Sequence, residues 1–232
     1  MKGFIAALRW DLFRQTKYNI VGVTIAVTLL YLAVLYYVPL EGRNLDLLLI
    51  LLIFNDPAAL SVLFVGALVL FERTDRTFFA LAVSPLTPAA YLWSKSLSLG
   101  LLATLASAGM AIVGHGWDLH WGWFILGLLL SSILFCLLGF VVVAYCQSFN
   151  QYILRVALVL IPIGLPLLNL FGMTDTYWWY LLPSQATLIL LEASLTTLPL
   201  GALLYAVGYL VLWIVLAYWF ALRAYSDVIA KA

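Results

Sequence analysis

Apolar residues run in long blocks along this chain, and polar residues gather in short segments between the blocks. A helix needs about 20 mostly apolar residues to cross the hydrocarbon core of a bilayer. Six blocks meet this requirement, and we predict membrane-spanning helices over residues 20–38, 47–71, 90–113, 123–146, 152–171 and 199–222. The predicted fold is therefore an all-α membrane protein, with one six-span transmembrane domain over residues 20–232.

The first 19 residues follow a different pattern, in which apolar and charged side chains are mixed. The apolar residues fall on one face of a helix, at Phe4, Ile5, Leu8 and Leu12. We predict an amphipathic helix over residues 1–19 that lies along the membrane surface, with its basic side towards the lipid headgroups.

The composition supports a membrane protein, because 66% of the residues are hydrophobic and only 9% are charged. Soluble domains carry roughly 25% charged residues. The net charge is +1 and the chain has no basic run, so no nucleic-acid partner is expected. Cys136 and Cys146 form neither a Cys-x-x-Cys motif nor a zinc-like spacing, and we predict buried, inert thiols.

The basic residues indicate the orientation of the chain. With six spans both termini lie on one side of the membrane, and of the 11 Lys and Arg residues only Arg43 falls on the other side. Basic residues concentrate in cytoplasmic loops. We therefore predict a multi-pass protein of a bacterial or archaeal cytoplasmic membrane, with both termini in the cytoplasm.

The outer side carries two aromatic connections. In residues 172–198 an aromatic run is followed by an apolar stretch, Leu181 to Ala193, that is too short to span. We predict short re-entrant or surface-lying helices there, before the last span. In the other connection His115 and His120 flank Asp118, so a haem- or metal-handling assembly module is an alternative function. The same histidines fit interfacial residues without a ligand, and no metal ligand is assigned.

Small residues recur at helical spacing in the third and fourth predicted spans. Lipid supplies little hydrophobic drive for helix association, so close packing through small side chains matters. We predict helix-contact faces at Ser96, Gly100, Thr104 and Ala108 in the third span, and at Gly127, Ser131 and Gly139 in the fourth.

The second predicted span contains the polar residues Asn55 and Asp56, followed by Pro57. An ionisable side chain at membrane depth is costly and is a functional candidate, and proline favours a kink. Two interpretations stay open: a polar lining of a translocation path, or residues bonded to neighbouring helices at the kink. An intramembrane enzyme built on Asp56 would need a second catalytic group, and no catalytic residue is predicted.

The connection between the second and third spans pairs the densest charges of the chain with the apolar run FFALAV, residues 78–83. The charges are Glu72, Arg73, Asp75 and Arg76. Ser84 and Pro85 end the apolar run, and Thr87 with Pro88 has the pattern of a helix cap followed by proline at the first helical position.

These signals predict a short cytosolic helix over residues 76–83 with an apolar surface that includes Phe78, Phe79 and Leu81. Such a surface needs a cover. We favour a cytoplasmic protein partner over the bilayer surface, because charges and prolines fix both ends of the segment. The chain has no Gly-x-x-x-x-Gly-Lys-Ser/Thr loop, so it cannot bind ATP through a P-loop of its own.

The order of elements and one stretch of sequence resemble a known family. The residues that carry the resemblance are Phe71-Glu72-Arg73, Phe78-Phe79-Ala80-Leu81, Val83-Ser84-Pro85-Leu86, Tyr91 and Lys95. This pattern resembles the permease subunit of ABC type-2 exporters, and is most similar to small permeases for fluoroquinolones or other drugs. The chain departs from the family at Thr77, where members commonly have a glycine before a threonine.

The resemblance implies a half-transporter with an N-terminal elbow helix, working as a homodimer or with a similar chain. Two cytoplasmic ABC ATPase subunits would bind ATP and Mg²⁺ and dock on residues 76–83 as a coupling helix, and the chain itself would hold no cofactor. The implied ATPase-coupling residues are Glu72, Arg73, Asp75, Arg76, Phe78, Phe79, Leu81, Ser84 and Pro85. Asn55 and Asp56 are the candidates for the translocation path.

Overall fold

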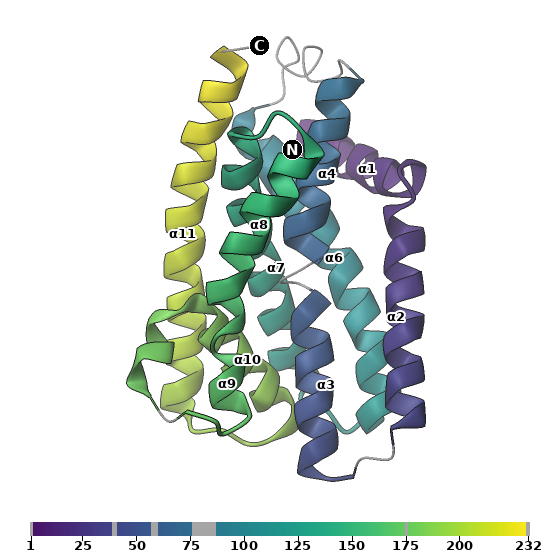
Figure 1. Cartoon of the computed structure of the whole chain (residues 1–232), viewed down its shortest axis with the longest axis vertical. Helices are drawn as coiled ribbons and strands as arrows, with labels where there is room; N and C mark the ends of the chain where they lie inside the picture. Colours follow the sequence, from purple (N-terminus) through teal and green to yellow (C-terminus); the bar gives the residue numbers. More distant parts are fainter. Residues whose placement is uncertain (1, 39–40, 57–59, 76–86, 175, 231–232) are drawn as a thin grey trace.

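The computed structural model describes residues 2–38, 41–56, 60–75, 87–174 and 176–230, and every regular element in these ranges is a helix. In chain order the elements are α1 (Lys2–Lys17), α2 (Ile20–Tyr37), α3 (Arg43–Asn55), α4 (Ser61–Thr74), α6 (Pro88–His115), α7 (Trp121–Ala144), α8 (Phe149–Gly164), α9 (Leu167–Leu170), η2 (Tyr177–Leu181), α10 (Pro183–Leu195) and α11 (Leu200–Ala230). The longer helices run side by side along one axis and form a bundle (Figure 1).

Five helical stretches in the described residues are long and apolar enough to cross a membrane. They are Ile20–Tyr37, Pro88–His115, Trp121–Ala144, Phe149–Leu170 and Leu200–Tyr225. Each overlaps one of the predicted spans, which confirms the helical membrane character of the chain.

The remaining predicted span, residues 47–71, includes residues 57–59, which lie outside the described residues. Its residues fall in α3 and α4, and Asp56 is the C-terminal cap of α3. The predicted kink at Pro57 falls on residues 57–59 and therefore lies outside the described part of the chain. Figure 1 shows α3 and α4 following one another along the bundle axis, so together they extend over most of its length.

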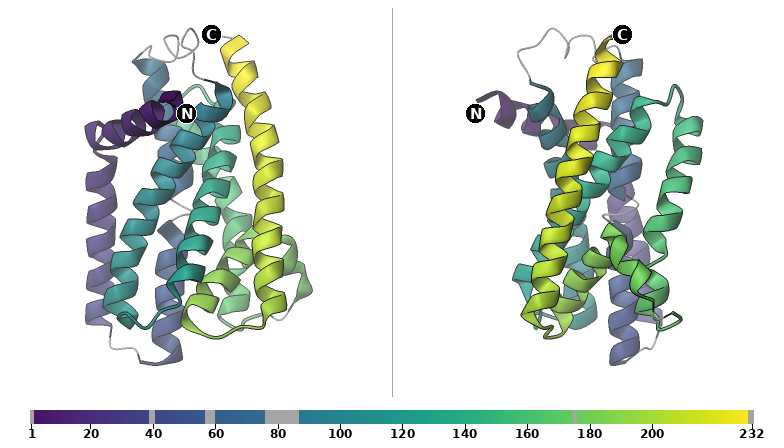
Figure 2. Two further views of the ribbon diagram at one scale, coloured as in Figure 1. Left: turned by 180° about the vertical axis from the view of Figure 1, so that it is seen from behind. Right: turned by 90° about the vertical axis from the view of Figure 1, so that its left-hand side faces the viewer.

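Helix α1 runs across the axes of the long helices at one end of the bundle (Figure 2). It meets α2 at Asn19, whose φ of 59° lies in the left-handed region that asparagine tolerates better than most residues. Its polar side chains Asp11, Arg14 and Gln15 are buried against the bundle, whereas Ile5 and Phe13 are more than half exposed. The helix therefore buries three polar side chains against the bundle and presents several apolar ones outward, together with exposed polar residues such as Lys17.

Helix α7 is the centre of the packing and contacts α4, α6, α10 and α11. Gly139 allows this closeness, because a Cβ atom there would lie 2.5 Å from the Val65 side chain of α4. A Cβ atom on Gly127 would lie 2.9 Å from Leu190 of α10. These contacts confirm the predicted contact face of the fourth span.

The end of the bundle away from α1 is formed by α9, η2 and α10 (Figure 1). Helix α10 overlaps the predicted short outer helix and begins with Pro183 at its first turn, where proline is tolerated. Most of its side chains are buried, because α10 packs on both α7 and α11. The start of α1 and the end of α11 are both at the opposite end of the bundle (Figures 1 and 2).

Candidate functional site

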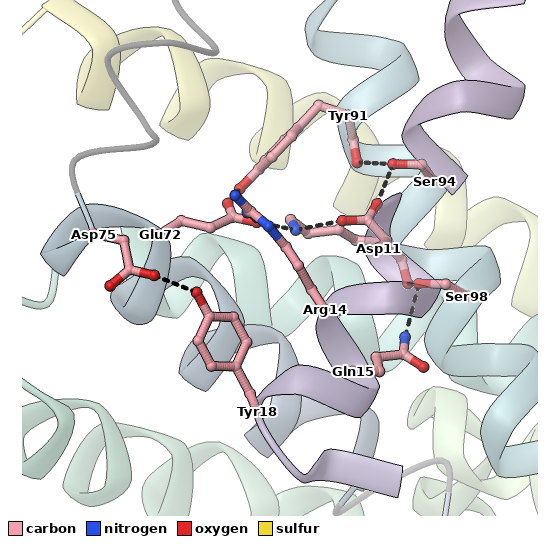
Figure 3. Close-up of polar contacts among 10 residues, drawn as sticks. Asp11, Arg14, Gln15, Tyr18, Glu72, Asp75, Tyr91, Ser94 and Ser98 are labelled. Atoms are coloured by element: carbon pink, nitrogen blue, oxygen red, sulfur yellow. Dashed lines mark hydrogen bonds and ion pairs between the residues drawn. The ribbon is translucent and has the colours of Figure 1, made fainter. Parts of the chain in front are cut away.

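A cluster of buried charged groups lies where α1, α4 and α6 meet. Its centre is Glu72 in the last turn of α4, which is fully buried. The Oε1 atom of Glu72 accepts hydrogen bonds from Arg14 of α1 and Lys95 of α6, and Oε2 accepts one from the Tyr91 hydroxyl. Figure 3 shows Arg14 and Tyr91 converging on this carboxylate from different helices.

Asp11 completes the cluster from α1. Its Oδ1 atom accepts a hydrogen bond of 2.8 Å from the ammonium group of Lys95, and Oδ2 accepts one of 2.6 Å from Ser94. One turn further along both helices, the Gln15 amide donates to Ser98 at 2.9 Å. Figure 3 shows these bonds as a row between α1 and α6.

We call Asp11, Arg14, Glu72 and Lys95 the charge cluster. Two carboxylates face two cations, so the charges of the cluster balance. Burial of an isolated charge is costly, and removal of one partner of a buried ion pair costs about 3–5 kcal/mol. Residues three or four apart in a helix lie on the same side of it. Asp11 and Arg14 of α1 therefore point the same way, as do Tyr91 and Lys95 of α6. A cavity of about 40 Å³, large enough for a water molecule, adjoins the cluster.

Arg73, the next residue, reaches in another direction. Its guanidinium group donates to the backbone carbonyl oxygens of Cys146 at 2.8 Å and Val143 at 3.4 Å, at the C-terminal end of α7. A cation is favourable at this end of a helix dipole. A guanidinium remains charged at neutral pH, so Arg73 brings a full positive charge to this end of α7. Arg155 of α8 donates to the neighbouring carbonyl of Tyr145, so two arginines hold this end of α7.

Asp75 caps the end of α4 and joins it to the turn between α1 and α2. The Tyr18 hydroxyl donates to its Oδ2 atom at 2.6 Å, and the Tyr18 ring packs on Phe71 with a centroid distance of 4.9 Å. Burial, followed by the hydrogen bond to Asp75, raises the pKa of Tyr18. The contact is visible in Figure 3.

Of the coupling residues predicted from sequence, Glu72, Arg73 and Asp75 thus bond to different parts of the fold. Residues Arg76, Phe78, Phe79, Leu81, Ser84 and Pro85, with the predicted helix over 76–83, lie outside the described residues. The predicted helix start at Thr87 and Pro88 is confirmed. The Thr87 hydroxyl accepts a hydrogen bond of 3.2 Å from the Ala90 backbone N–H, and Pro88 is the first residue of α6.

Sequence reasoning missed the part that α1 plays in the site. Asp11, Arg14 and Gln15 recur at three- and four-residue steps, which is the signal of a polar helix face. That spacing shows only that the three residues lie together. Whether they meet water, headgroups or buried partners depends on helices that are distant in the sequence.

The two predicted path residues point to different helices. Asp56 is fully buried, and its Oδ2 atom accepts a hydrogen bond of 3.1 Å from Ser107 of α6. Asn55 is exposed, and its amide donates to the Tyr31 hydroxyl of α2 at 2.6 Å.

The outer histidines do not converge. His115 Nδ1 lies 3.4 Å from Asp46 Oδ1 of α3, and the backbone N–H of His120 donates to Ser194 of α10. The described residues include no group of three or more His, Cys, Asp or Glu side chains placed to hold a metal ion. Both cysteines are buried and free, as predicted.

Comparison with known proteins agrees with the resemblance in the sequence. The model of the fluoroquinolones export permease protein family matches residues 2–232. Two fluoroquinolones export permease proteins of Mycobacterium tuberculosis, from strains CDC 1551 and H37Rv, are each 28% identical to this chain over 214 residues, covering 92% of this chain and 89% of the relative. The chain therefore belongs to the fluoroquinolones export permease family, whose members are membrane transport subunits and not catalytic enzymes.

Proposed function

We propose that this chain is the membrane-spanning permease subunit of an ABC exporter. A second permease copy completes the translocation path, and two separate ATPase subunits bind ATP and Mg²⁺ and dock on the loop between the second and third spans. The family match supports a permease, and the relatives' names make fluoroquinolones the first substrates to test.

In the proposed membrane arrangement, α3 and α4 together form the second of six spans. The bundle end that carries α1 and the end of α11 faces the cytoplasm, which agrees with the distribution of basic residues. The outward apolar side chains of α1, among them Trp10 and Phe13, then enter the interfacial layer of the bilayer. Helix α10 becomes the short re-entrant element on the outer face.

The observation that carries the proposal is the set of bonds at the end of α4. Glu72 binds α1 and α6, Arg73 binds the end of α7, and Asp75 binds the α1–α2 turn. The proposed coupling segment, residues 76–83, follows directly. A displacement of this segment would move α4, and hydrogen bonds to charged groups would pass the movement on to α1, α6 and α7. Such bonds are shorter and stronger than neutral ones.

This arrangement suggests how ATP binding in the partner would act on the path. Closure of the two ATPases would move both coupling segments, and α4 would move with α1 and α6 because the charge cluster joins them. Arg73 would transmit the same displacement to α7, which contacts α10 and α11. The path would thereby change from facing inward to facing outward.

Co-purification with a co-expressed ABC ATPase subunit from the same organism tests the proposal. The double variant with Phe78→Asp and Phe79→Asp is expected to lose the ATPase, because charges replace the apolar docking surface. Met173→Asp is the matched control, since it adds a charge at an exposed apolar position at the other end of the bundle. Retention of the ATPase by the double variant at the level of the unmodified chain would disprove docking at residues 76–83.

A further inference from the structure

Asp56 is an acidic group in the interior of the bundle. It caps the C-terminal end of α3, which lies about halfway along the bundle in Figure 1, and none of its surface is exposed. Charged side chains at membrane depth are expensive, and those that persist commonly mark substrate or ion pathways. The position therefore calls for a functional explanation.

The surroundings of Asp56 do not compensate a negative charge. Ser107 of α6 donates one hydrogen bond to Oδ2, whereas Oδ1 is buried and has no hydrogen-bond partner among the described residues. The adjacent Phe54 packs on Phe135 of α7, and Ile53 is also buried. None of the ion pairs found among the described residues involves Asp56.

One neutral donor is too little to stabilise a buried carboxylate, because an uncompensated charge in an apolar interior becomes neutral by changing its protonation. In this conformation Asp56 therefore holds its proton. Ionisation requires water or a cation beside it. A cavity along α6, lined by Ser61 and Ala103 among others, has a volume of about 10 Å³ and is too small for either a drug or a hydrated ion. A ligand would enter only when α3 and α6 separate.

The chemistry around Asp56 favours an organic cation over a metal ion. Hard divalent cations need about six oxygen ligands, and the described residues include no group of three or more His, Cys, Asp or Glu side chains placed to hold a metal ion. One carboxylate among apolar side chains and a serine hydroxyl suits an ammonium group attached to an apolar body.

We propose that Asp56 binds the ammonium group of an exported organic cation in exchange for a proton. When α3 and α6 separate, the carboxyl O–H bond breaks, the proton passes to water, and the carboxylate pairs with the ammonium group. Ser107 donates to the carboxylate throughout, and no oxidation or reduction is involved. This inference rests on the proposed export function and specifies the substrate class.

The test uses the full permease with its ATPase in lipid nanodiscs and a fluorescent quaternary ammonium probe, whose charge does not change with pH. Because binding of the cation releases one proton, the affinity of the permease for the cationic probe is expected to rise by up to about tenfold for each unit that the pH is raised. An uncharged probe of similar shape is expected to show no such slope. Asp56→Asn removes the slope for the cation, whereas Asp46→Asn, at the outer end of the same helix, retains it.

Ser107→Ala provides a second test that keeps the carboxyl group. Loss of the serine donor favours the protonated acid, so the whole binding curve for the cation is expected to shift to higher pH. The inference would be overturned if the affinity of Asp56→Asn for the cationic probe still depended on pH. It would also be overturned if the curve of affinity against pH were unshifted in Ser107→Ala.

ATP hydrolysis and assembly are measured on the same samples. If the complex assembles and hydrolyses ATP while Asp56→Asn keeps the slope, the cation site is wrong and the exporter proposal stands. If the unmodified permease never assembles with the ATPase, the exporter proposal itself fails.

Discussion

The ammonium group of Lys95 donates a hydrogen bond to the carboxylate of Glu72, and both side chains are fully buried. Glu72 precedes the segment between α4 and α6, and Lys95 follows it. The ion pair therefore ties together the two helices that the proposed coupling segment connects. Since Asp11 and Arg14 of α1 join the same pair, a force on the segment acts on three helices together.

Removal of Lys95 should destabilise the protein strongly. Lys95→Met leaves the carboxylates of Asp11 and Glu72 with Arg14 as the remaining cation of the charge cluster, and the expected loss is about 3–5 kcal/mol. Chemical unfolding of the purified chain in detergent measures it. Lys17→Met, an exposed lysine of α1, should change little.

The double variant of Lys95→Met with Glu72→Gln restores the balance of charge, so its loss should be smaller than the sum of the two single losses. Additive losses would show that the pair is not energetically coupled.

Arg73→Gln should separate coupling from binding of the ATPase. The change removes the bonds from α4 to the end of α7, so substrate-stimulated ATP hydrolysis and export should fall while the ATPase still co-purifies. The expected loss of stability is about 1.5–3 kcal/mol, as for hydrogen bonds to charged groups.

Arg155→Gln is the matched control for Arg73, because Arg155 holds the same end of α7 from α8. It should reduce stability but leave coupling intact. Equal coupling defects in both variants would mean that the end of α7 matters and the link to α4 does not.

Tyr18 should contribute a pH-dependent part of the stability. Its pKa is raised in the folded chain, so the folded state holds the phenol proton more tightly than the unfolded state. This contribution is complete below about pH 10, the ordinary value for tyrosine, and is lost as the pH rises further.

Unfolding measured across the alkaline range should therefore show a shallower loss of stability in Tyr18→Phe than in the unmodified chain. Tyr177→Phe removes an exposed hydroxyl from the other end of the bundle and serves as the control. Identical slopes in all three proteins would contradict the assignment.

Gly139→Ala should disturb the contact between α4 and α7. The added methyl group would lie 2.5 Å from Val65 and 3.0 Å from the Val62 carbonyl oxygen, so we expect a loss of about 1–3 kcal/mol from overpacking. Gly109→Ala meets nothing within 4 Å and should stabilise α6 by up to about 1 kcal/mol through helix propensity. Thermal unfolding compares the two, and equal effects would argue against close packing at Gly139.

The elements of the fold could be predicted because their signals are local. The blocks of apolar residues located the helices, and the pair Thr87–Pro88 located the start of α6, since a helix cap is made within one turn. By contrast, the role of α1 could not be predicted, because its polar face shows no partner in the sequence.

By itself, the sequence determined that this is a helical membrane protein, roughly where most of its long helices lie, and which short segment between spans has an apolar run beside its densest charges. Only the tertiary structure decided which charges meet. Arg14 and Glu72 are 58 positions apart, and Asp11 and Lys95 are 84 apart. Such pairs form because packed helices bury these charges, and a buried charge is stable only beside its opposite.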